Sequence, residues 1–358
     1  MTNETLYLIA FAMNPSIKEV DKKNWLEQYG SATHLFDASQ NDAALQCIQW
    51  PLEQAKKEMD FILAHQIQVI SILDNNYPSR LKHCPDAPIL LYYKGEGNFN
   101  KPHLISVVGA RKHTIYVNKI VNDLIEGIAH LNIGIISGLA QGVDGLVHQK
   151  ALEKNIPTWG VLGHGLQQIY PPMHRKLAIQ MLSNGGLLTE FYSNTAPLAF
   201  HFPKRNRIVA GMSDATLIIE SGLQGGSMIT ASLALQYNRE VFAVPGKLYD
   251  EKSQGCLDLV KNHIAQLYHG PEHFLNMVNW PPAPTTNQVK QNTTLQMSMD
   301  PTQKMILLYI ENQGPLYYDN LSTHFKLPPG QLASNLLALE LAGMIMKIAG
   351  GRYARNLL

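Results

Sequence analysis

The chain has 358 residues, of which 45% are apolar, and its formal net charge at pH 7 is only +1. A chain of this length and composition can bury a substantial core and is long enough for two or three domains. The small net charge excludes a strong whole-molecule attraction to nucleic acid, so any such affinity has to come from a local basic patch.

The three cysteines, Cys47, Cys84 and Cys256, lie far apart and form no CxxC pair. This spacing indicates neither a disulfide framework nor a zinc site, and we expect no metal and no cofactor. The first residues lack a basic segment followed by a small-residue cleavage site, and no apolar run approaches the ~20 residues that a membrane helix needs. We therefore expect a cytoplasmic protein with no membrane partner.

Residues 1–65 are predicted to form a small helical domain of the SAM or helix-hairpin-helix type. Apolar residues such as Leu6, Ile9, Trp25 and Leu26 supply faces that polar turns interrupt. No catalytic pattern occurs in this segment.

Residues 66–275 are predicted to form a Rossmann-like α/β domain with a mainly parallel sheet. Short β-branched runs alternate there with glycine loops and amphipathic stretches, as in a sheet with crossover helices. The runs occupy 104–108, 133–136, 158–162, 186–190, 215–220 and 241–245. Ligands of open parallel sheets bind outside the carboxyl ends of the strands, so the loops after these runs are the candidate site.

Residues 276–300 are predicted to be a linker, because Trp280 and several prolines precede a stretch rich in Gln, Asn and Thr without periodicity. Residues 301–358 fit a winged-helix domain, with a turn at 328–330, a helix over 331–342 and a hairpin around Gly350 and Gly351.

The expected recognition helix of that domain contains no lysine or arginine and carries Glu340. The nearby cations Lys347, Arg352 and Arg355 fall on the wing. This distribution favours weak backbone or protein contact over sequence-specific reading of duplex DNA.

The loops after the first two strand runs are candidate anion sites. Gly109 would let a backbone amide approach a phosphate to which Arg111 adds a bidentate contact, although a tight turn with a surface arginine explains the pair equally well. Gly138 and Gly142 open a helix whose amino terminus would offer free amides to an anion. Asp144, in the first turn of that helix, is expected to support the site by complementing the helix dipole rather than to act in catalysis.

The densest cationic cluster is the segment HFPKRNRIVAG at 201–211. It places Lys204, Arg205 and Arg207 within four positions, just before an apolar helix that is expected to reach Met212. A solvated charged face is the ordinary explanation, but the adjoining Phe202 adds a base-stacking surface, which favours nucleic-acid binding.

A third glycine loop, ESGLQGGSMITA at 220–231, lets Gly225, Gly226 and Ser227 donate to a phosphate. The chain contains no P-loop, HExxH or GxSxG motif. Glu190 and Glu220 end strand runs, but nothing in the sequence pairs them as an acid and a base.

Seven motifs occur in series along the central domain. They are YPSRLKHCPDAPILLYYKG at 77–95, VVGAR at 107–111, SGLAQGVDGLVHQKAL at 137–152, VLGHGLQQIYPPMH at 161–174, FPKRNRIVAGMS at 202–213, GGSMITA at 225–231 and VPG at 244–246. In order and spacing this series resembles the DNA-processing protein A family, also called DprA or Smf. The flanking segments are similar to its helical N-terminal and winged-helix C-terminal domains.

The resemblance implies a homodimer that binds incoming single-stranded DNA in natural transformation, shields it and helps to load the RecA recombinase. It also implies which residues bind DNA: Gly109, Arg111, Gly138, Lys204, Arg205, Asn206 and Arg207, with Gly225, Gly226 and Ser227 beside them. The cationic members would hold phosphates. The chain departs from the family pattern at Ala110, Val117, Gly225 and Leu257, where a hydroxyl residue, glycine, serine and asparagine are usual.

Two enzyme classes compete with this interpretation. Phosphoribohydrolases of the lysine-decarboxylase-like fold, which act on nucleoside monophosphates, carry a PGGxGTxxE loop, but GGSMITASLA has no acidic residue after its glycine pair. A nucleotide-linked oxidoreductase would need GxGxxG after the first strand, and the chain lacks it. Binding without catalysis is therefore favoured, so we expect no enzyme.

Overall fold

The structure is a computed structural model that describes residues 2–281, 300–348 and 352–355. It divides into two compact units, Met1–Pro284 and Thr285–Leu358, which are considered separately. Most of the expected linker at 276–300 lies outside the described residues.

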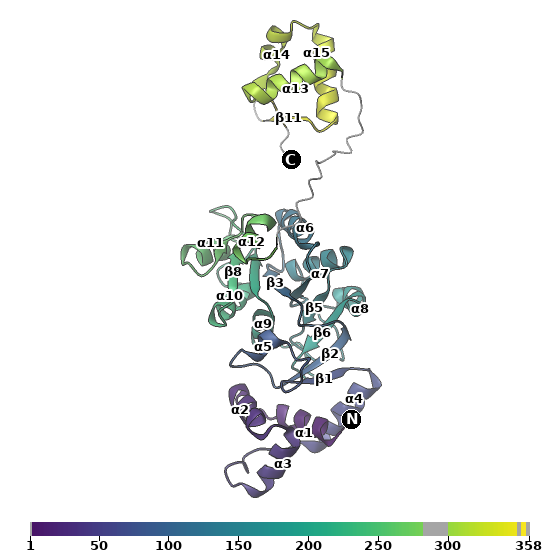
Figure 1. Cartoon of the computed structure of the whole chain (residues 1–358), viewed down its shortest axis with the longest axis vertical. Coiled ribbons are helices and arrows are strands. Elements are labelled where there is room, and N and C mark those ends of the chain that lie inside the picture. Colours follow the sequence, from purple (N-terminus) through teal and green to yellow (C-terminus); the bar gives the residue numbers. More distant parts are fainter. Residues whose placement is uncertain (1, 282–299, 349–351, 356–358) are drawn as a thin grey trace. The chain divides into compact units, whose positions relative to one another are not determined.

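The larger unit opens with four helices, as predicted for residues 1–65. They are α1 (Asn3–Ala12), α2 (Glu19–Tyr29), α3 (Ala32–Asn41) and α4 (Leu52–Ala64). Glu4 of α1 accepts hydrogen bonds from the amides of Ala32 and Thr33 at 2.7 and 2.8 Å, which satisfies two free donors at the start of α3. Phe11 is fully buried in a core shared with Leu91 and Tyr92 of the sheet. The helices therefore pack directly against the α/β fold, next to β1 in Figure 1.

The sheet has nine strands in the order β1-β2-β6-β5-β4-β3-β7-β8-β9. The strands are β1 (Gln68–Ser71), β2 (Leu90–Glu96), β3 (His103–Gly109), β4 (Ile133–Ser137), β5 (Thr158–Val161), β6 (Gly185–Thr189), β7 (Ala215–Ile219), β8 (Glu240–Ala243) and β9 (Gln266–Leu267). β2 pairs antiparallel with β1 and β6, and every other pair is parallel. The predicted mainly parallel sheet is confirmed.

Helices cover both faces of this sheet. They are α5 (Ser79–Lys82), α6 (Tyr116–Ile128), α7 (Val143–Glu153), α8 (Arg175–Met181), α9 (His201–Gly211), α10 (Gly226–Gln236), α11 (Gln254–Lys261) and α12 (Pro271–Met277), with a 3-10 turn at Pro172–His174. Successive residues of β3 point to opposite faces: Leu104 and Val108 join one buried cluster, and Ile105 and Val107 join the other. Burial on both faces explains why these strands read as continuous apolar runs.

The strand order reverses direction at β3. From β3 the chain continues to β4, β5 and β6 on one side, and then crosses through α9 to β7, which pairs with the other side of β3. Such a reversal opens a crevice at the carboxyl ends of the strands, here those of β3, β4 and β7.

The folded unit continues beyond residue 275, into the segment predicted as linker. Trp280 is only 7% exposed, and its ring centroid lies 4.7 Å from that of His103 and 5.5 Å from that of Phe274. The described part of this segment therefore contains the end of α12 and the buried Trp280, and it belongs to the folded unit.

The smaller unit has the predicted winged-helix architecture. Its elements are α13 (Pro301–Gln313), β10 (Leu316–Tyr317), α14 (Tyr318–Phe325), α15 (Pro329–Leu341), β11 (Ile345–Ile348) and β12 (Arg352–Arg355). β11 and β12 form the expected antiparallel hairpin, and Gly350 and Gly351 lie outside the described residues. Within the described parts of the chain, no helix combines the length and apolarity needed to cross a membrane.

Candidate nucleic-acid interface

A cleft of about 420 Å³ lies at the point where the strand order reverses. We call it the switch-point cleft. Its walls are the loops after β3, β4 and β7 and the helices α9 and α10. Eight of the ten predicted DNA-binding residues line it, namely Gly109, Arg111, Gly138, Arg205, Asn206, Gly225, Gly226 and Ser227, together with the supporting residue Asp144.

Gly109 is required by close packing at the end of β3. A Cβ atom at this position would lie 1.9 Å from the carbonyl oxygen of Ile219, at the end of β7. The next residue, Ala110, accepts a hydrogen bond from the amide of Val143 at 3.2 Å, which ties this loop to the start of α7. Only glycine lets β3 and β7 approach closely enough to form the floor of the cleft.

Asp144 accepts hydrogen bonds from backbone amides at the loop after β4, where the sequence predicts free amides. Its Oδ2 accepts hydrogen bonds from the amides of Gly138 and Ala140 at 3.1 and 3.3 Å. Burial raises the pKa of Asp144, while the nearby Arg205 guanidinium and these amides act in the opposite direction. Asp144 thus supports the loop after β4, and the amides of Gly138 and Ala140 are not available to an anion.

Arg205 forms the inner, buried part of the cleft wall. Its Nη1 donates to the carbonyl oxygen of Gly138 at 2.6 Å and also to that of Val161. Burial lowers the pKa of Arg205 to about 10, so the guanidinium remains charged at neutral pH. Arg205 therefore ties α9 to the loop after β4 and to the end of β5 while adding positive charge to the cleft.

Phe202 lies between two guanidinium groups. Its ring centroid is 5.8 Å from the Cζ atom of Arg111 and 5.9 Å from that of Arg205, both within cation–π range. The ring of Tyr170, whose side chain is 43% exposed, lies 5.9 Å away on a neighbouring loop. Because Arg111 itself is exposed, the cleft edge combines an accessible cation with aromatic surface.

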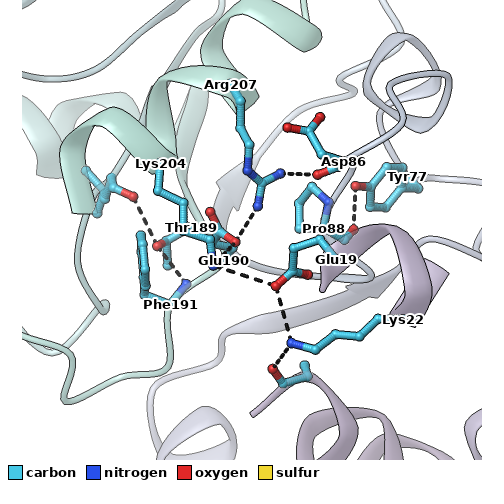
Figure 2. Close-up of polar contacts among 12 residues, drawn as sticks. Glu19, Lys22, Tyr77, Asp86, Pro88, Thr189, Glu190, Phe191, Lys204 and Arg207 are labelled. Atoms are coloured by element: carbon cyan, nitrogen blue, oxygen red, sulfur yellow. Dashed lines mark hydrogen bonds and ion pairs between the residues drawn. The ribbon is translucent and has the colours of Figure 1, made fainter. Parts of the chain in front are cut away.

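Lys204 and Arg207 are not brought into the cleft. The sequence suggested that the basic cluster precedes a helix, whereas these residues lie within α9, which begins at His201. A helix turns by ~100° per residue, so positions three apart share a side and adjacent positions diverge. Lys204 and Arg207 accordingly face Glu190 at 3.1 and 2.6 Å (Figure 2). Arg205, by contrast, lines the cleft.

The start of α10 offers free backbone donors to the cleft. Among the described residues, no acceptor bonds to the amides of Gly226 and Ser227, and the space beside the Cα of Gly226 is open. Asn206 donates to the carbonyl oxygen of Gly226 at 3.1 Å and so fixes α9 against α10. Of the three donors that the sequence predicts here, the amides of Gly226 and Ser227 are free at the start of this eleven-residue helix, whereas the amide of Gly225 already donates to the carbonyl oxygen of Gly222 at 3.0 Å.

A second cavity, of about 660 Å³, adjoins the cleft at Arg111. Lys112, His113, His174 and Lys176 also line it, and none of its described lining residues is a carboxylate. The lysines among them were not predicted as site residues, although they stand in the basic runs RKH at 111–113 and HRK at 174–176. They extend the positive surface beyond the cleft.

The two strand-end glutamates have structural partners. Glu220 accepts from the amide of Thr114 at 2.9 Å and from its hydroxyl group, and Glu190 pairs with Lys204 and Arg207. Neither carboxylate lines the switch-point cleft.

Comparisons with known proteins match nearly the whole chain after the first helices. Residues 68–279 match the family described as DNA recombination-mediator protein A, and residues 281–351 match the domain described as DprA winged helix domain. Protein Smf of Escherichia coli (strain K12) is 35% identical over 284 residues, which cover 78% of this chain and 75% of that protein. The DNA processing protein DprA of Bacillus subtilis (strain 168) is 37% identical over 209 residues, covering 58% of this chain and 70% of that protein.

Two solved structures share this architecture. DNA processing protein A from Streptococcus pneumoniae superposes with a TM-score of 0.65 at 29% identity, covering 77% of this chain and 98% of that one. DNA processing protein A from Helicobacter pylori, whose structure is described for its single-stranded DNA binding mode, gives a TM-score of 0.54 at 29% identity and covers 60% of this chain and 96% of that one.

Proposed function

Because the chain belongs to the DNA recombination-mediator protein A family, also called DprA or Smf, we propose that it binds single-stranded DNA in the switch-point cleft without sequence preference. The observation that carries this proposal is the arrangement of the exposed Arg111 over the ring of Phe202, beside the free amides of Gly226 and Ser227. Charge and free amides suit phosphates, and an aromatic ring suits an unstacked base. Arg205 and Asn206 hold these groups in place.

The adjoining cavity supports a binding path longer than the cleft alone. A strand that leaves the cleft past Arg111 meets Lys112 and Lys176, with no carboxylate among the described lining residues. The cavity beside β8 is instead lined by two carboxylates, Glu220 and Asp250, and one lysine, Lys247. Since carboxylates repel phosphates, the charge pattern favours a path across α8.

The cleft offers little support for catalysis. Asp144 is the one carboxylate among its described lining residues, and its Oδ2 already accepts two backbone amides. The residues that α10 contributes to the cleft, Gly226, Ser227, Ile229 and Thr230, include no acid of the kind a phosphoribohydrolase uses. We therefore infer a binding protein rather than an enzyme.

The family membership extends the proposal to a cellular role. The protein would act in the cytoplasm during natural transformation as a homodimer, shield incoming single strands and help to load the RecA recombinase. This part rests on the resemblance of the chain to its family.

Fluorescence anisotropy with labelled oligo-dT and a matched duplex, measured across a salt series, tests the DNA-binding site. Arg111→Ala is expected to weaken oligo-dT binding roughly tenfold, since a hydrogen bond to a charged group contributes about 1.5 kcal/mol, and to lower the salt slope by about 0.7. Lys57→Ala, which removes an exposed charge from α4, is the control. Equal binding of strand and duplex, or an equal effect of both variants, would refute this site.

A further inference from the structure

Lys204 is held between two carboxylates on the side of α9 that faces away from the switch-point cleft. Its Nζ lies 3.1 Å from Oε2 of Glu190, which follows β6, and 3.6 Å from Oε1 of Glu19, at the start of α2 (Figure 2). The Lys204 side chain is nevertheless 43% exposed. It is thus a solvent-accessible cation whose partners come from two different parts of the fold.

Lys204 is the most loosely bound member of this network. Arg207 is buried against Glu190 at 2.6 Å, and Lys22 is buried between Glu19 at 3.3 Å and the carbonyl oxygen of Ala12 at 3.0 Å. A partly exposed ion pair contributes little net free energy, so its lysine can exchange a carboxylate for another anion. Glu19 is also the carboxylate partner of the buried Lys22, so its substitution acts on both lysines, and only a Lys204-dependent change in DNA binding reports on the Lys204 contact.

Glu19 is fixed in front of α9 by the packing of α2. On the same helix, Lys23 donates to the carbonyl oxygens of Lys82 and Cys84 at 2.8 and 3.2 Å, which anchors α2 to the segment around α5. The four N-terminal helices thereby present a carboxylate to a helix that lines the cleft.

We propose that Glu19 is an autoinhibitory residue: by pairing with Lys204 it keeps this cation off a DNA strand in the switch-point cleft, so the N-terminal helices lower the affinity for single-stranded DNA. The neighbours of Lys204 in sequence, Pro203 and Arg205, both line the cleft. The flexible four-carbon stem of a lysine allows its ammonium group to turn toward a phosphate that crosses the start of α9. The proposal rests on the proposed function and adds a contribution from the N-terminal helices.

The test compares Glu19→Gln with wild type in the full chain, by anisotropy with labelled oligo-dT across a salt series. We expect binding two- to fivefold tighter at low salt and a salt slope steeper by about 0.7, the value for one additional phosphate contact on a single strand. Glu27→Gln is the matched control, because Glu27 is exposed on the same helix and, among the described residues, has no ion-pair partner. Circular dichroism and urea unfolding of each variant verify the fold.

The same substitution in a Lys204→Ala background separates this mechanism from a general change of charge. There Glu19→Gln is expected to give no gain in affinity and no change in salt slope. A gain that persists without Lys204, or one that Glu27→Gln reproduces, overturns the proposal while leaving the proposed function intact. Absence of oligo-dT binding by wild type overturns both.

Discussion

Arg205 lies directly against Gly138, and the contact leaves no room for a side chain at position 138. Nη1 of Arg205 donates to the carbonyl oxygen of Gly138 at 2.6 Å, and a Cβ atom at 138 would lie 2.6 Å from both terminal nitrogens of the guanidinium. The glycine is therefore needed for packing against the arginine. This contact joins α9 to the loop after β4 and forms the inner wall of the cleft.

Gly138→Ala is expected to displace the Arg205 guanidinium and to lower the free energy of unfolding by about 1–3 kcal/mol, the usual cost of overpacking a buried site. Urea unfolding measures this loss. Gly226→Ala is the control, because nothing lies within 4 Å of a Cβ atom there, and its stability is expected to stay level or to rise by up to about 1 kcal/mol. Equal losses in the two variants would contradict the packing argument.

Glu190→Gln is expected to destabilise the fold strongly, because it leaves the buried Arg207 guanidinium without its carboxylate. Removing one partner of a buried ion pair typically costs about 3–5 kcal/mol of unfolding free energy. The double variant Glu190→Gln/Arg207→Met, which removes both charges, is expected to recover a large part of this loss. Urea unfolding of the two single variants and the double variant measures the coupling. Strictly additive losses would show that the pair is not coupled.

The stability of the protein is expected to fall with acid through His148. Burial lowers the pKa of this histidine to about 3 from an ordinary value of 6.5. The unfolded chain therefore binds the proton first as the pH falls. The stabilisation from keeping His148 neutral is complete above pH 6.5 and is lost progressively toward pH 3. Between pH 6.5 and 5 the loss is ~2 kcal/mol.

His148→Leu provides the control for this pH dependence, since it removes the titrating group. Urea unfolding of the variant at pH 7 and pH 5 is expected to show a smaller difference than in wild type. Identical differences would assign the acid sensitivity to other groups.

Trp280→Ala is expected to destabilise the larger unit by about 3–5 kcal/mol, because it empties a buried aromatic site between His103 and Phe274. Met277→Ala, at a side chain that is 45% exposed, is expected to change the unfolding free energy by less than about 0.5 kcal/mol. Thermal or urea unfolding of the full chain compares the two. A negligible effect of Trp280→Ala would place the end of the folded unit before this residue.

The sequence predicts the positions of the parallel strands well, but it does not show which side of α9 each cation faces. β3 to β8 are buried on both faces and so appear as apolar runs, whereas β1 begins with exposed Gln68 and β2 ends in the less buried residues 94–96, which weakens their strand pattern. The three cations at 204, 205 and 207 look like one cluster when the helix start is placed after them. Their partners Glu190 and Glu19 cannot be recognised from local spacing, because they come from distant segments that only the tertiary fold brings together.

The division of α9 into two sides has a consequence for how related chains vary. A side chain at position 138 would clash with the guanidinium of Arg205. Relatives that differ at one of these two positions are therefore expected to differ at the other. Lysine at position 204 meets the partly exposed Glu19 and Glu190, which is already paired with Arg207, so packing alone does not fix this residue. An alignment of relatives is therefore expected to show that the residues at positions 138 and 205 vary together. On the other side of α9, a basic residue at 204 is expected to occur together with an acidic residue at 19.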